Sequence, residues 1–148
     1  MKNIFPSVLI VFTCIVTFSQ EPFNTNEGVA IEGYDVVSYF EGKPAKGSKE
    51  FSSQLDGITF WFENEDHLFK FNKTPLKYIP QYGGYCAYAM GKSGEKVSIN
   101  PKAYLIKEGK LYLFYKNIAV NTLKKWREEN PQELKEKADK NWFNITHQ

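Results

Sequence analysis

Two sulfur-bearing side chains stand four residues apart in the segment YCAYAM, where Cys86 and Met90 follow a Gly-Gly pair. On a helical turn, residues i and i+4 point to the same side. A thiolate and a thioether together form a soft donor set that suits copper(I). The spacing therefore predicts a transition-metal site on Cys86 and Met90, with copper as the favoured ion.

Cys86 has two other interpretations that the sequence leaves open. A free cysteine is often a small buried apolar residue, and methionine often fills gaps in a core. Alternatively, the thiol is a redox group; without a resolving cysteine it would need an external reductant or a mixed disulfide. Gly83 and Gly84 precede it and permit close approach of the backbone. Metal ligand, redox thiol and core residue are thus three competing hypotheses.

The N-terminus predicts export. Lys2 is followed by the apolar run IFPSVLIVFTCIVTF and then by the polar stretch SQEPFNTNEG, which is the order of regions in a secretory signal peptide. The run is shorter than the ~20 residues of a membrane-spanning helix. We therefore expect residues 1–20 to be a signal peptide, cleaved near Ser19 or Gln20. The mature chain is expected to be periplasmic or secreted, to span no membrane and to keep Cys86 as its single thiol, which excludes a disulfide framework.

The composition argues against charged macromolecular partners. The chain has 19 Lys and Arg against 17 Asp and Glu, a net charge of +2. A nearly neutral chain has no electrostatic attraction to nucleic acid or to anionic lipid. The expected partners are therefore a metal ion or a small ligand. Aromatic residues make up 16% of the chain, and we expect their rings to dominate the core.

Local patterns predict the elements that position these residues. After a flexible lead-in over 21–27, the segments KEFSSQL and ITFWF predict two strands joined by a turn at Asp56-Gly57. Asn64 is expected to cap a helix through EDHLFKFNK, which ends at Thr74-Pro75. The segment LKYIPQYGGYCAYAM predicts a packed loop with one short helical turn, and GKSGEK after it a mobile loop.

The C-terminal half predicts a second hairpin and two helices. AYLIK and KLYLFY flank a turn at Glu108-Gly109. The segment NIAVNTLKKWREEN has helical spacing, with Ile118 and Trp126 on one side, and Pro131 begins a helix that reaches Trp142. This order predicts an α+β fold in a single domain over 28–145. The residues expected to be buried are Trp61, Phe71, Tyr78, Leu111 and Trp126.

Four segments together resemble the YHS-domain proteins in their long exported form: AIEGYDVVSYF, FWFENEDHLFKFNKTPLKYIP, QYGGYCAYAM and GKLYLFY. The resemblance runs from about Gly28 to Trp142. It implies a small β-hairpin packed on a helix, extended here by the second hairpin and the C-terminal helices.

The resemblance also implies where a metal would bind. Metal-type YHS modules carry one cysteine after an Asp-Pro-Val-like run and two cysteines four residues apart, where the second strand enters the helix. In this chain the positions fall on Ser38, Glu63 and His67, so none of them is a thiol. Glu63 and His67 still form a carboxylate–imidazole pair, which is a donor set that proteins use for metals. A helix start without any ligand function is the simpler alternative.

These features predict an exported binding module for a transition metal such as copper, with Cys86, Met90, His67 and Glu63 as ligands. Cys86 is expected to share one pocket with Tyr82 or Tyr85 and the 63–71 helix start. The first alternative is a single-cysteine thiol redox protein. The second is a non-catalytic domain that is structural or binds a small ligand in an apolar pocket. No catalytic residue is predicted, because the sequence shows no Ser-His-Asp order and no phosphate-cradling glycine motif.

Overall fold

The computed structural model describes residues 22–148, so the predicted signal peptide lies outside the described residues. The elements of the N-terminal half are, in chain order, β1 (Thr25–Asn26), β2 (Val29–Ala30), the 3-10 helices η1 (Ile31–Gly33) and η2 (Ser38–Glu41), β3 (Ser48–Leu55), β4 (Ile58–Phe62), α1 (Glu65–Lys73) and α2 (Pro75–Tyr78). Those of the C-terminal half are η3 (Gln81–Gly84), α3 (Ala87–Lys92), β5 (Asn100–Lys107), β6 (Lys110–Phe114), α4 (Thr122–Glu128) and α5 (Pro131–Thr146). Within the described range, no helix combines the length and the apolar character that crossing a bilayer requires.

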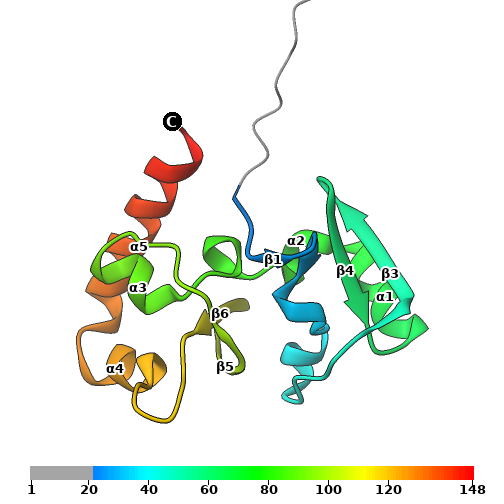
Figure 1. Ribbon diagram of the computed structural model, residues 1–148, viewed down its shortest axis with the longest axis horizontal. Coiled ribbons are helices and arrows are strands. Elements are labelled where there is room, and N and C mark those ends of the chain that lie inside the picture. The colour runs from blue at the N-terminus through cyan, green and yellow to red at the C-terminus, as the bar shows by residue number, and fades with distance from the viewer. Residues whose placement is uncertain (1–21) are drawn as a thin grey trace, which may run out of the picture.

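The fold is α+β, as predicted, and its strands form two small sheets. The first sheet has the order β1-β2-β4-β3, in which β2 and β4 run parallel and the other pairs antiparallel. The second sheet is the antiparallel hairpin β5-β6. Figure 1 shows β3, β4 and α1 on one side of the molecule and α3, α4 and α5 on the other.

The local signals at turns and caps are confirmed. Asp56 and Gly57 both have positive φ in the β3–β4 turn, and Glu108 and Gly109 do so in the β5–β6 turn, which is the geometry of tight two-residue hairpins. The Asn64 side chain accepts a hydrogen bond from a backbone amide in the first turn of α1. These features depend on neighbouring residues alone, so the sequence was sufficient to predict them.

The predicted flexible lead-in over 21–27 differs from the structure, because its described part is tied to the rest of the fold. The Asn24 amide donates to the Gly83 carbonyl at 2.8 Å, and its side chain donates to the Gly84 carbonyl at 3.0 Å. Phe23 packs edge-on against Phe60 with ring centroids 5.7 Å apart. Partners about 40 to 60 residues away hold this segment, and the local composition gives no sign of them.

The helix predicted from Asn117 onward begins later than expected. The Asn117 side chain accepts hydrogen bonds from the amides of Ala119 and Val120 and so forms a turn. Ile118 consequently lies fully exposed on that turn rather than on a helix face. Asn121 caps α4 instead, by accepting from the Lys124 amide at 3.1 Å. Hydrogen bonds between asparagine side chains and nearby backbone amides compete with helix formation, and here they move the start of the helix from Asn117 to Thr122.

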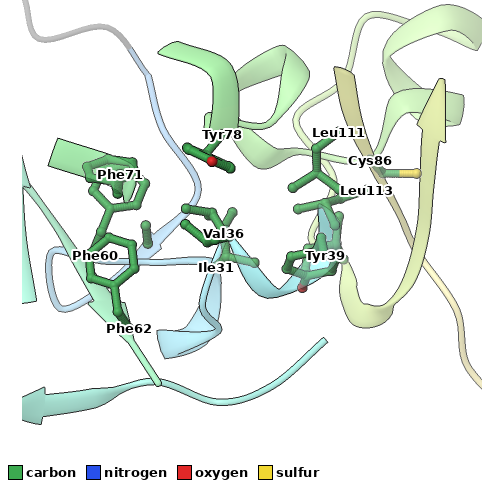
Figure 2. Close-up of a cluster of buried hydrophobic side chains, with 13 residues drawn as sticks. Ile31, Val36, Tyr39, Phe60, Phe62, Phe71, Tyr78, Cys86, Leu111 and Leu113 are labelled. Carbon is green, nitrogen blue, oxygen red and sulfur yellow. The ribbon is translucent and has the colours of Figure 1, made fainter. Parts of the chain in front are cut away.

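The core consists of two clusters that share β6. Leu111 and Leu113 belong to the first cluster, which also contains the rings from β4 and α1. Tyr112 and Phe114 belong to the second cluster, which includes Trp126. Because successive residues of a strand point to opposite faces, β6 separates the two clusters and contributes to both. Figure 2 shows the first cluster, with Phe60 and Phe71 at one end and Leu111, Leu113 and Cys86 at the other.

Four of the five predicted core residues, Phe71, Tyr78, Leu111 and Trp126, are buried. Trp61 is only partly buried. Its ring instead covers Gly33, where an added Cβ would lie 2.8 Å from a ring carbon. Trp61 faces away from the core because its strand neighbours Phe60 and Phe62 occupy the buried positions.

Candidate functional site

The most heavily bonded polar group of the described chain is the carboxylate of Asp35, which is fully buried. Its Oδ1 accepts hydrogen bonds from the amides of Val37 at 2.8 Å and Ser38 at 3.3 Å. Its Oδ2 accepts from the Glu63 amide at 2.8 Å and from Nδ1 of His67 at 2.6 Å. A buried carboxylate requires such partners, because an unpaired charge away from water is strongly unfavourable.

These contacts gather the positions that the family resemblance pointed to. Ser38 lies beside Asp35 and donates its hydroxyl to the Asp35 carbonyl at 2.6 Å. Glu63 and His67 lie on the other side of the same carboxylate. Asp35, Glu63 and His67 can each offer a ligand atom, and these three atoms lie within 4.8 Å of one another. The sequence analysis did not include Asp35 as a ligand; its signal was local, in the Asp-x-x-Ser spacing of an Asx-type turn.

His67 is buried between two carboxylates. Besides the bond to Asp35, its Nε2 lies 3.2 Å from Oε2 of Glu41. Burial lowers the pKa of His67, but the hydrogen bonds and negative charges of Asp35 and Glu41 together outweigh it and raise the pKa above its ordinary value. The imidazolium form is favoured, because only that form can donate from both nitrogens.

The carboxylate of Glu41 is in turn held by a lysine of α1. Lys70 forms ion pairs with Glu41 at 3.1 Å and with Asp66 at 2.7 Å. The Lys70 hydrogen bond, followed by the charge of His67, lowers the pKa of Glu41. The chain Asp35–His67–Glu41–Lys70 therefore alternates in charge from the interior to the surface and connects the 35–41 segment to α1.

Cys86 lies in a different environment, with no exposed surface. Its Sγ accepts a hydrogen bond from the Tyr115 amide at 3.3 Å and lies 3.3 Å from Oγ1 of Thr122. The single hydroxyl proton of Thr122 is donated to the Tyr115 carbonyl at 2.7 Å. The sulfur of Cys86 therefore has two polar partners inside the core, the Tyr115 amide and the Thr122 hydroxyl.

Of the four predicted metal ligands, the structure brings Glu63 and His67 together. Cys86, by contrast, belongs to the first core cluster and Met90 to the second. Cys86 precedes α3 with a non-helical ψ of 116°, so the one-sided alignment of residues i and i+4 does not extend to it. Cys86 also contributes nothing to the groove that Tyr82 lines.

A large groove lies where the two halves of the chain meet. It has a volume of about 1040 Å³. The lining comes from the start of the described chain, the β3–β4 turn, the region of α2 and η3, and the last turns of α5. Figure 1 shows β1 running between α5 and the β3–β4 hairpin. Its apolar lining residues are Pro22, Phe23, Leu55, Ile58, Phe60, Leu76, Ile79, Pro80, Trp142 and Phe143.

Two apolar side chains of this groove are exposed to solvent, namely Leu76 at 83% and Phe143 at 58%. The α5 residues in the lining are Asp139, Trp142, Phe143 and Thr146, and the C-cap residue His147 follows them. The first four of these recur at intervals of three and four residues, so one face of the helix is turned to the groove. Sequence reasoning had not singled out α5 for function.

Gly83 is one of the residues that line the groove. It has a φ of +58°, and an added Cβ would lie 2.5 Å from the Pro22 carbonyl oxygen and 2.7 Å from the Trp142 ring. The Tyr82 side chain beside it donates its hydroxyl to Asp139 at 2.8 Å. The Gly-Gly pair thus allows Pro22, η3 and α5 to approach closely.

Comparisons of the chain with protein-family models, with curated proteins and with solved structures gave no match. The resemblance to YHS-domain proteins therefore stays a prediction from the sequence, and the function has to be argued from the geometry of this molecule.

Proposed function

We propose that this protein is a non-catalytic binding domain that takes a small apolar ligand in the groove between the β3–β4 turn, α2 and the end of α5. The observation that carries the proposal is a groove of about 1040 Å³ whose lining includes ten apolar residues. Ligand sites of proteins are typically concave, largely apolar and equipped with a few polar groups. The polar groups here are Asp56, Gln81, Tyr82, Asp139, Thr146 and His147.

The contacts of Cys86 and His67 support a binding domain over the alternatives. A buried thiol that already has two partners offers no accessible nucleophile for redox exchange. Both nitrogens of His67 and both oxygens of Asp35 already take part in hydrogen bonds. The side chains of Cys86, His67 and Asp35 are therefore all engaged in contacts within the protein, which favours a binding role over a catalytic one.

Metal binding keeps one supporting observation, the proximity of Asp35, Glu63 and His67. An ion there would have to replace the hydrogen bond between His67 and Asp35, because a metal ligand needs a free nitrogen lone pair. Copper binding through Cys86 and Met90 likewise stays a prediction. Equal copper(I) affinity of wild type and Cys86→Ser in a chelator competition would end it.

Binding in the groove can be tested with the neutral fluorescent probe N-phenyl-1-naphthylamine. We expect saturable binding by the wild type and a loss of about fivefold or more in affinity for Phe143→Ala, since removing one buried aromatic contact from an interface commonly costs over 1 kcal/mol. Phe69→Ala is the matched control, because Phe69 is a phenylalanine of similar exposure (64%) on α1 that does not line the groove.

The proposal fails if the wild type shows no saturable binding, or if Phe143→Ala and Phe69→Ala bind the probe as tightly as the wild type. Thermal unfolding of both variants would check that they remain folded. An equal loss in both would indicate non-specific adsorption of the probe to exposed rings.

A further inference from the structure

We infer that the groove selects apolar ligands that carry a positively charged head group, a conclusion that rests on the proposed binding function. The charge of the lining is the first observation. Two carboxylates, Asp56 and Asp139, are among the lining residues, whereas none of the described lysines or arginines is. The chain as a whole has more Lys and Arg than Asp and Glu, so the groove differs in sign from the average surface.

Asp139 is positioned to receive such a head group. It lies on the α5 face that is turned to the groove, one helical turn before Trp142 and Phe143. Its Oδ1 accepts the hydroxyl of Tyr82 at 2.8 Å, which orients the carboxylate against η3. A carboxylate oxygen has two acceptor positions, so each oxygen retains capacity for a further donor.

Lys135 offsets part of this charge, since its Nζ lies 2.7 Å from Oδ2 of Asp139. Lys135 is one turn earlier on α5 and does not line the groove. A ligand in the groove therefore meets the carboxylate and the rings of Trp142 and Phe143. Aromatic faces attract ammonium groups as well, which adds to the preference for a cation.

The chemistry of the lining thus points to an amphiphile with an amine or quaternary ammonium group at one end and an apolar chain or ring system at the other. The apolar part would occupy the region of Leu76, Ile79 and Phe60, and the cation would lie near Asp139. Fatty acids and other anionic amphiphiles would bind more weakly, because the carboxylates of the lining repel them.

Three decyl compounds that differ only in the head group test this inference: decyltrimethylammonium, decyl glucoside and decyl sulfate. Each is titrated below its critical micelle concentration at pH 8, and the indole N–H resonance of Trp142 reports binding. We expect the cation to bind about 25-fold more tightly than the anion, because one unit charge at ~4 Å in water raises the affinity of the cation about fivefold and lowers that of the anion about fivefold.

Asp139→Asn is expected to remove most of this preference and to leave the affinity for decyl glucoside unchanged. Glu136→Gln is the matched control, because it removes the same charge from the exposed surface of α5 outside the groove, and it should keep the preference. If Asp139→Asn unfolds, Asp56→Asn provides the second test, with a smaller loss of preference expected.

The outcomes separate the inference from the proposed function. Equal binding of all three compounds by the wild type, tighter binding of the sulfate, or an unchanged preference in Asp139→Asn would overturn the charge selectivity while groove binding stands. If none of the compounds shifts the Trp142 resonance and the neutral probe does not bind, the proposed function itself is wrong.

Discussion

At the scale of single residues, His67 forms ion pairs with one carboxylate in the interior of the protein and with another at its surface. Its two nitrogens contact a buried carboxylate and a half-exposed one. The protonated ring satisfies both, whereas a neutral ring has one proton and would leave one nitrogen lone pair facing a carboxylate. The protonation state of His67 should therefore affect how firmly the 35–41 segment is held to α1.

The first prediction concerns the pH dependence of stability. Because the pKa of His67 is raised above its ordinary value of 6.5, its contribution is fully present below about pH 6 and is lost as the pH rises through the folded-state pKa. The free-energy difference of unfolding between the wild type and His67→Gln should shrink over that range. Denaturant unfolding between pH 5 and pH 9 measures it.

NMR titration supplies the control for this prediction. Glu41→Gln should lower the pKa of His67 while the fold stays intact, because Glu41 is half exposed and not part of the core. A stability difference that does not vary with pH would show that the imidazole is held by geometry and not by charge.

At the scale of elements, the contact between α3 and α5 depends on a glycine. Gly91 lies in α3, within the stretch that the sequence had indicated as a mobile loop, and is buried. An added Cβ there would lie 2.5 Å from the Leu134 carbonyl oxygen of α5. Backbone atoms cannot move aside as a side-chain end can, so the two helices pack this closely only over glycine.

The second prediction follows from that contact. Helix propensity alone would make Gly91→Ala stabilising by about 1 kcal/mol. We expect the opposite sign, a loss of about 1–3 kcal/mol, because the added methyl overpacks the α3–α5 contact. Chemical denaturation measures the difference. A gain in stability for Gly91→Ala would contradict the close packing.

At the scale of the whole molecule, strand β6 joins the two core clusters. Its alternating residues enter both clusters. Trp126 packs against Phe114 with ring centroids 5.6 Å apart, and Phe71 packs against Phe60 and Phe62 at 4.9 Å. Removal of the ring of Trp126 or of Phe71 should therefore destabilise both clusters, because they share a strand.

The third prediction is that Trp126→Ala and Phe71→Ala each destabilise the protein by about 3–5 kcal/mol, and that each variant still unfolds in a single transition. Thermal unfolding followed by fluorescence and by circular dichroism would test both parts. Phe69→Ala, at an exposed position, should change stability by under about 0.5 kcal/mol. A change under about 1 kcal/mol for Trp126→Ala, or two separate transitions, would show that the C-terminal helices are an appended unit.

The features that the sequence alone determined are those fixed by neighbouring residues. The Asp56-Gly57 and Glu108-Gly109 turns, the Asn64 cap and the start of α5 at Pro131 follow from backbone preferences and local side-chain bonds. These signals, with the order of strands and helices, were enough to predict the α+β class and most of the buried residues. Where two local signals competed, as at Asn117, the pattern of apolar residues placed the helix start too early.

The tertiary structure decided everything that depends on distant partners. Asp35 joins Glu63 and His67 across 28 and 32 residues, and Thr122 completes the contacts of Cys86 across 36. The groove is formed by Pro22 and Phe23, the β3–β4 turn, the region of α2 and η3, and the last turns of α5, and no sequence periodicity predicts that these segments meet. The same applies to Cys86 and Met90: their spacing predicted one site, but a non-helical ψ at Cys86 and the two faces of β6 placed them in different clusters. Local chemistry specifies the elements, whereas burial and charge pairing between them decide which residues meet.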